Sequence, residues 1–300
     1  MAVKGSSQLN QVKPVSKKVR KAVIPAAGFG TRFLPATKSM PKEMLPIIDK
    51  PAIHYAVEEA VRAGIEEIIF ITGRGKRAIE DYFDHSYELE DLLEIKGKTE
   101  ILAQIRQISD MADIVYIRQK EALGLGHAVL RARDWVGDEP FAVILPDVLI
   151  DSEESCTKQL IRAYEETGKS VIGVKEVEWD QVSSYGIVDP ETDGDCFNIR
   201  AVVEKPSREE APSNLSIVGR YIFTPEIFKY LAITEPGKGG EIQLTDAIAK
   251  MIKAEGVCGA TYEGDDYDTG DKLGFLKATV SLALKHEELG KEFKEYLGKL

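Results

Sequence analysis

Short apolar runs alternate with stretches of apolar residues at helical spacing along the first half of the chain. Residues 21–25, KAVIP, form an apolar run that stops in a glycine-rich loop, which predicts a strand. From Pro51 the apolar positions keep a helical period until Gly64, and residues 67–72, EIIFIT, resume a strand. These three elements predict one βαβ unit.

The alternation continues with a strand over 113–118, a helix over 126–136 and a buried strand over 141–145. This order predicts an α/β fold: a Rossmann-like mixed, mostly parallel sheet with helices on both faces. Apolar residues at helical spacing predict a helical insertion over 82–109. The second half predicts a helix to about residue 167, a strand over 170–177, turn-rich β segments to residue 223, helices near 225–231 and 241–254, a strand over 257–262, an acidic loop over 265–271 and a long amphipathic C-terminal helix.

The loop after the first strand contains Gly28 and Gly30. A dinucleotide-binding fingerprint would need a glycine where Phe33 stands, and a P-loop would need a GK[ST] that is missing. Three cations follow instead: Arg32, Lys38 and Lys42. Small residues let main-chain N–H groups approach phosphate oxygens, and cations offset the charge that develops there. The loop therefore predicts a triphosphate site, with an ordinary turn and solvated cations as the alternative.

The charge of the chain is unevenly distributed. There are 39 Lys and Arg against 50 Asp and Glu, a net charge of −11, which argues against a broad nucleic-acid surface and means that phosphates must meet a local cluster of cations. The first 20 residues are basic and contain no acid. We predict a disordered tail there, with a basic binding arm as the alternative. A single domain then spans 21–300, with one half at about 21–150 and a second half with the C-terminal helices at about 151–300.

Metal-ligand and membrane signals are sparse. The three cysteines lie far apart without a CxxC, and the four histidines never pair at ligand spacing, so carboxylates would have to hold any metal. The apolar stretches fall short of the roughly 18 residues of a membrane span, and no signal-peptide core is present. We expect a cytoplasmic protein with no membrane or nucleic-acid partner.

Residues 25–51, PAAGFGTRFLPATKSMPKEMLPIIDKP, resemble the signature of the bacterial UTP:glucose-1-phosphate uridylyltransferases, within the sugar-nucleotidyltransferase family. The similarity continues in order through RQKEALGLGHAVL (118–130), LPD (145–147), YGIV (185–188), VEKP (203–206), GRYIF (219–223), GEIQLTDAI (240–248) and YDTGDK (267–272). It covers essentially everything after the tail.

The resemblance implies a nucleotide-diphospho-sugar transferase fold, a nucleotide-binding first half and a sugar-binding second half. It also implies transfer of the uridylyl group of UTP to glucose 1-phosphate, giving UDP-glucose and pyrophosphate by an in-line, Mg²⁺-assisted displacement. Similar proteins assemble as homodimers or homotetramers. The alternatives are a related enzyme for dTTP or another sugar 1-phosphate, and a non-catalytic paralogue that binds nucleotide sugars and regulates a partner.

The same resemblance assigns roles to residues of this chain. Nucleotide binding is assigned to Ala26, Ala27, Gly28, Gly30, Thr31, Gln119 and Gly124. Catalysis is assigned to Arg32, Lys42 and Lys205, and sugar binding to Gly186, Glu204 and Lys205. Mg²⁺ is assigned to Asp147 and Asp268.

Local pattern leaves some of these roles open. Asp147 ends a buried strand, where functional carboxylates of open parallel sheets lie, but it could also cap a turn. Glu204 and Lys205 would point to opposite sides of a strand unless the chain bends, and we expect Pro206 to supply that bend. We give His127 no catalytic role, and Arg220 could be structural or line the sugar site.

Overall fold

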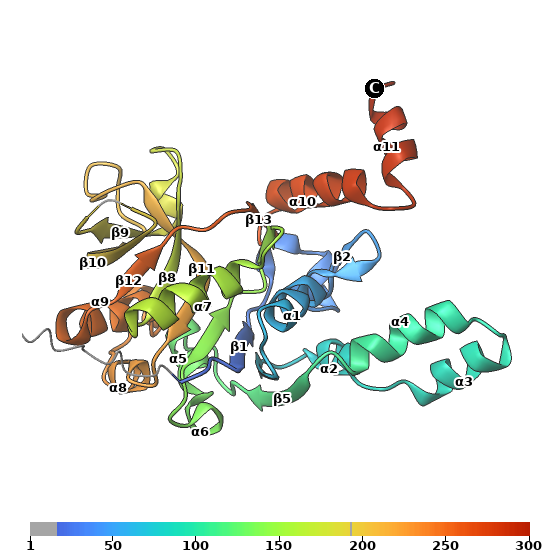
Figure 1. Ribbon diagram of the computed structural model, residues 1–300, viewed down its shortest axis with the longest axis horizontal. Helices are drawn as coiled ribbons and strands as arrows, with labels where there is room; N and C mark the ends of the chain where they lie inside the picture. Colours follow the sequence, from blue (N-terminus) through green and yellow to red (C-terminus); the bar gives the residue numbers. More distant parts are fainter. Residues whose placement is uncertain (1–16, 193) are drawn as a thin grey trace, which may run out of the picture.

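The computed structural model describes residues 17–192 and 194–300, and a single twisted sheet forms its centre (Figure 1). The strand order is β5-β4-β1-β6-β11-β8-β12-β10-β9. The strands are β1 (Lys21–Ala26), β4 (Glu67–Thr72), β5 (Asp113–Arg118), β6 (Phe141–Ile144), β8 (Val171–Glu176), β9 (Gly186–Pro190), β10 (Cys196–Glu204), β11 (Leu215–Phe223) and β12 (Cys258–Ala260). Strands β5, β4, β1 and β6 are parallel, whereas β10 and β11 are antiparallel to their neighbours. The predicted mixed sheet is confirmed.

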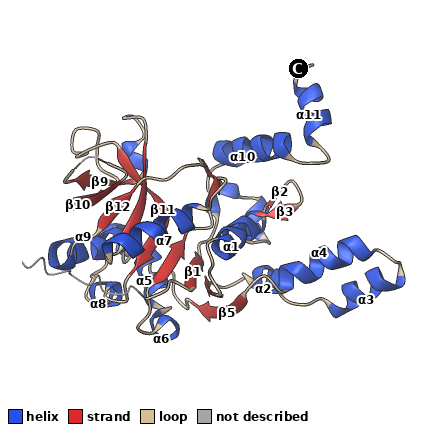
Figure 2. Cartoon of the chain, in the orientation of Figure 1, coloured by secondary structure: helices blue, strands red, loops and turns tan. Residues whose placement is uncertain are grey.

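Helices cover both faces of the sheet (Figure 2). On one face lie α1 (Ala52–Arg62) and α7 (Cys156–Thr167); on the other lie α5 (Leu125–Leu130), α8 (Ile227–Ala232) and α9 (Leu244–Glu255), with the short α6 (Arg133–Val136) nearby. Side chains alternate along each strand, so Ile24 of β1 packs under α1 while Val23 packs under α5. The apolar run that predicted β1 thus contributes side chains to two hydrophobic cores, as expected for a strand buried on both faces.

Two predicted helices are interrupted. The helix expected over 126–136 is divided into α5 and α6, and the C-terminal helix is divided into α10 (Lys272–Lys285) and α11 (Gly290–Leu297). The second break occurs because His286 is extended and its ring Nδ1 accepts the N–H groups of Glu288 and Leu289 at 3.2 and 3.4 Å. Several apolar side chains of this predicted amphipathic region are exposed: Leu273, Leu276, Leu284 and Leu289.

The predicted insertion forms the projecting pair α3 (Tyr87–Ile95) and α4 (Thr99–Ser109), which follows α2 (Arg77–Phe83) (Figure 1). The predicted acidic loop is partly a strand, β13 (Asp265–Asp268), which pairs with β7 (Val148–Asp151). The remaining short elements are η1 (Thr31–Phe33), η2 (Ala36–Lys38), η3 (Lys42–Met44), β2 (Pro46–Ile47), β3 (Lys50–Pro51), η4 (Val182–Ser184) and η5 (Lys238–Gly240). In the described part of the chain, no helix is both long and apolar enough to span a bilayer.

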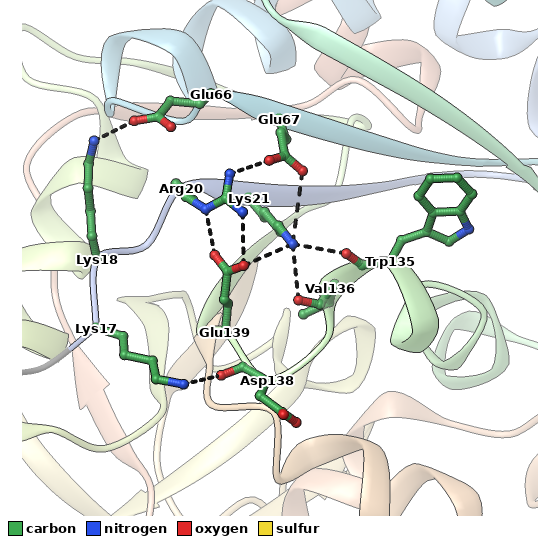
Figure 3. A network of polar contacts seen from close by, with 10 residues as sticks. All are labelled: Lys17, Lys18, Arg20, Lys21, Glu66, Glu67, Trp135, Val136, Asp138 and Glu139. Carbon is green, nitrogen blue, oxygen red and sulfur yellow. Dashed lines mark hydrogen bonds and ion pairs between the residues drawn. The ribbon is translucent and has the colours of Figure 1, made fainter.

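The described chain begins with residues that are bound to the domain (Figure 3). Lys17 donates to the carbonyl of Asp138 at 2.8 Å, and Arg20 pairs with Glu139 at 2.6 Å and with Glu67. Val19 is only 3% exposed. Our prediction of a tail up to residue 20 is therefore wrong for residues 17–20, whose basic side chains have carboxylate and carbonyl partners far along the sequence. The tail predicted for residues 1–16 lies outside the described residues.

Candidate active site

The candidate site lies where β1 and β6 end. These strands are parallel neighbours, with Val23 opposite Val143, so the loops that follow them leave the same edge of the sheet. Open α/β sheets bind ligands at this edge. A cavity of about 460 Å³ is lined by residues that include Ala27, Gly28, Gly30, Thr31, Lys42, Gln119, Gly124 and Asp147. A second cavity of about 540 Å³ is lined by residues that include Arg32, Asp147, Gly186, Glu204, Lys205 and Asp268.

Most of the predicted site residues therefore gather around two cavities that share Asp147. Ala26 is the exception, because it is 1% exposed in the core at the end of β1 and does not line either cavity. Gly30 directly precedes η1 in a left-handed conformation, with φ of 66°, and its carbonyl accepts the Thr37 hydroxyl at 2.7 Å. That conformation favours glycine and turns the chain so that Thr31 and Arg32 follow beside the cavities.

An ion pair joins the two loops at the boundary between the cavities. Lys42 Nζ donates to Asp147 Oδ2 at 2.7 Å. Burial acts to lower the pKa of Lys42, but the Asp147 carboxylate outweighs it, so this pKa is raised. Burial likewise acts to raise the pKa of Asp147, but Lys42 outweighs it and that pKa is lowered. Both groups are therefore charged at neutral pH.

Asp268 lies beside this pair, although it is far from it in sequence. The β13–β7 ladder places Asp268 opposite Val148, the residue after Asp147, and the Thr269 hydroxyl donates to the Asp147 carbonyl at 3.0 Å. A Cβ built on Gly270 would lie 2.8 Å from Asp268 Oδ1 and 3.3 Å from Asp147 Oδ2, so both carboxylates border one glycine. Burial, followed by the charge of Asp147, raises the pKa of Asp268, although the Gly270 N–H partly offsets this.

The chain bends beside the second cavity as expected, but the bend is at Lys205 and not at Pro206. Lys205 itself is left-handed, with φ of 46°, directly after β10 ends at Glu204. This conformation lets the Glu204 and Lys205 side chains line the same cavity, where Lys205 Nζ lies 3.7 Å from Glu204 Oε1. The other carboxylate oxygen of Glu204 accepts the Thr245 hydroxyl at 2.7 Å, a contact that the sequence did not indicate.

Sequence reasoning also missed two buried ion pairs that support the site. Arg220 is 1% exposed and binds Glu59 of α1 at 2.7 Å, which settles its role as structural. Its guanidinium also donates to the carbonyls of Leu145 and Val148, at 2.9 and 2.7 Å, on both sides of Asp147. Glu43, directly after Lys42, is 2% exposed and pairs with Lys76 at 2.7 Å. One available signal was a charged residue, Glu59, on the face of α1 whose other buried side chains are apolar apart from His54.

The comparison with known proteins agrees with this geometry. Residues 21–284 match the family model described as nucleotidyl transferase. The chain belongs to this family. The resemblance that the motifs indicated is confirmed by curated relatives named UTP–glucose-1-phosphate uridylyltransferase. One from Staphylococcus saprophyticus is 57% identical over 285 residues, covering 95% of this chain and 99% of the relative. One from Bacillus subtilis is 57% identical over 274 residues, covering 91% and 94%.

Solved structures of family members have the same fold. The UTP-bound UGPase from Acinetobacter baumannii has a TM-score of 0.88 at 45% identity, covering 94% of this chain and 100% of that one. A UDP-glucose pyrophosphorylase complexed with UDP-glucose has a TM-score of 0.83 at 44% identity, covering 90% of this chain and 100% of that one. The predicted nucleotidyltransferase fold is confirmed.

Proposed function

We propose that this protein transfers the uridylyl group of UTP to glucose 1-phosphate and releases pyrophosphate. The observation that carries the proposal is the meeting of two cavities at the Lys42–Asp147 pair, with Asp268 beside it. Two substrates held in adjoining cavities can react across their shared boundary. The names of the relatives, and the UTP and UDP-glucose held by similar structures, support the choice of substrates.

The reaction needs no nucleophilic side chain. A phosphate oxygen of glucose 1-phosphate forms a bond to the α-phosphorus of UTP while the bond to the β-phosphate breaks and pyrophosphate leaves. Such transfers depend mainly on alignment and on stabilising charge. Arg32 and Lys42 stabilise the triphosphate, and Lys205 binds the sugar phosphate. Gly28 and its neighbours provide the close backbone approach that the nucleotide requires.

Asp147 and Asp268 would hold Mg²⁺. Among residues 17–192 and 194–300, no group of three or more His, Cys, Asp or Glu side chains is arranged to hold a metal. Two carboxylates are nevertheless sufficient for Mg²⁺, which takes its other oxygens from substrate phosphates and water. The raised pKa of Asp268 means that its negative charge is poorly compensated in the protein alone, as a cation site requires. When bound, the metal would neutralise phosphate charge.

Pyrophosphate release tests the reaction directly. We expect rapid release with glucose 1-phosphate, Mg²⁺ and UTP, slower release with dTTP, CTP, ATP and GTP, and none once the metal is chelated. If another nucleotide were the best substrate, the uridylyl assignment would be wrong. If UDP-glucose bound but no nucleotide released pyrophosphate, the regulatory paralogue would replace the enzyme.

The cytoplasmic location and the assembly as a homodimer or homotetramer stay predictions. Light scattering can test the assembly.

Gly28→Ala is expected to weaken the binding of UTP without destabilising the fold. A Cβ at Gly28 meets nothing within 4 Å, so the variant should be as stable as the parent or more stable by up to about 1 kcal/mol. The added methyl group would occupy the cavity where the nucleotide approaches, and we expect KM for UTP to rise about tenfold. Gly298→Ala, at the end of α11 with helical backbone angles and only ordinary contacts, should have a similarly small effect on stability and leave KM unchanged. An unchanged KM for Gly28→Ala would place the nucleotide elsewhere.

A further inference from the structure

The side-chain amide of Gln119 is held between two acceptors in the first cavity. Its Nε2 lies 3.1 Å from the carbonyl oxygen of Gly124 and 2.9 Å from Nδ1 of His127. A carbonyl oxygen can only accept, so the amide atom that faces Gly124 is the nitrogen. An amide nitrogen can only donate, so Nδ1 of His127 must be the acceptor of its other hydrogen. The His127 proton is therefore on Nε2.

The protonation state of His127 is consistent with this arrangement. Burial, followed by the charge of Arg131, lowers the pKa of His127, and Glu121 opposes this only weakly. The ring is thus neutral at neutral pH and keeps a lone pair on Nδ1. The backbone supports the same geometry, because Gly124 has φ of 98° and a Cβ there would lie 2.8 Å from the Ile242 carbonyl oxygen. Gly124 and His127 together fix the orientation of the amide.

The fixed amide leaves only its oxygen for a ligand. Gln119 is 6% exposed and lines the first cavity, so Oε1 is the group that it offers there, and an amide oxygen can only accept. The pairing edge of uracil has one donor, N3–H, between two carbonyl oxygens. Thymine has the same edge. Cytosine has a lone pair at N3 instead, which would oppose Oε1 in the same placement.

We propose that His127 is a positioning residue for base selection, which holds Gln119 so that its oxygen faces the base and favours nucleotides with an N3–H. This inference rests on the proposed function and adds a determinant of base choice to it. Without His127, the Gly124 carbonyl retains one amide hydrogen and the other is left to water. The amide plane then loses its fixed orientation, and the difference between uracil and cytosine decreases.

Two substitutions separate this role from a structural one. His127→Phe keeps a planar ring but removes the acceptor, whereas His127→Asn offers its amide oxygen near the place of Nδ1. We expect His127→Phe to raise KM for UTP about tenfold and to lower the UTP-to-CTP ratio of kcat/KM about tenfold, as the loss of one hydrogen bond predicts. The UTP-to-dTTP ratio should stay unchanged, because both bases have N3–H. His127→Asn should restore most of the UTP-to-CTP ratio.

The tautomer can be measured without turnover. Long-range ¹H–¹⁵N NMR of the parent protein, with the His127 signals assigned by their loss in His127→Asn, should show an unprotonated Nδ1 and a protonated Nε2. A protonated Nδ1, or an unchanged UTP-to-CTP ratio in folded His127→Phe, would overturn the inference. If the parent enzyme did not use UTP, the proposed function would be wrong. The NMR result would still show whether Nδ1 of His127 accepts a hydrogen bond from Gln119.

Discussion

We expect Lys42→Met to lower kcat for pyrophosphate release about 10²- to 10³-fold while the protein stays folded. Lys42 Nζ lies at the boundary of the two cavities, 2.7 Å from Asp147, where the proposed reaction develops charge on the transferred phosphate. Removing one such charged donor from an active site typically has an effect of this size on kcat. The side chains of this pair are 20% and 33% exposed, so its contribution to stability is limited to about 1 kcal/mol. Steady-state kinetics and thermal unfolding measure the two effects.

Lys38→Met is the matched control for this prediction. Lys38 lies four residues before Lys42, at the end of the short helix η2. The sequence grouped it with Arg32 and Lys42 as a cation of the triphosphate site, but its side chain is exposed and lines neither cavity. Its loss changes the net charge equally, so kcat should stay within about twofold of the parent if only the position of Lys42 matters. Near-full turnover of Lys42→Met, or equal losses in both variants, would remove Lys42 from the mechanism.

The first half of the fold could be predicted from the sequence because its signals are local. Strands β1, β4 and β6 are buried on both faces, and such strands appear in the sequence as continuous apolar runs. Pro51 and Gly64 likewise bounded α1 to within a few residues. The glycine loop could be placed after a strand, and its missing third glycine argued against a dinucleotide site on sequence grounds alone.

Contacts between distant segments could not be predicted in this way. Asp147 and Asp268 meet only because β7 pairs with β13, and nothing in either segment specifies the other. Their joint role in one metal site came from the resemblance, whereas the strand pattern favoured only a functional position for Asp147 and left a turn cap open. The same limit explains the error at residues 17–20, where a basic run suggests a solvated segment unless its partners, such as Glu139, are known. The left-handed backbone conformation of Lys205 could not be predicted either, because hydrophobic periodicity does not report the φ angle of a single residue.

Arg220→Met should give the largest loss of stability among these variants. The buried guanidinium binds Glu59 through both carboxylate oxygens, and Glu59 also accepts the Thr157 hydroxyl at 2.6 Å. Burial acts to raise the pKa of Glu59, but Arg220 outweighs it and keeps the group ionised. Removing Arg220 leaves a buried charge without its partner, and we expect the free energy of unfolding to fall by about 3–5 kcal/mol. Urea denaturation followed by circular dichroism measures this loss.

The double variant Glu59→Leu/Arg220→Met distinguishes the unpaired charge from lost packing. Replacing both partners removes the buried charge, so the combined loss should be about 1–3 kcal/mol smaller than the sum of the single losses. Arg200→Met is the surface control, because its pair with Asp189 has an Arg side chain that is 60% exposed; it should cost less than about 1 kcal/mol. Additive losses, or equal losses at Arg200 and Arg220, would contradict the assignment. Since Arg220 also binds the carbonyls on both sides of Asp147, the folded Arg220→Met enzyme should have a lower kcat as well.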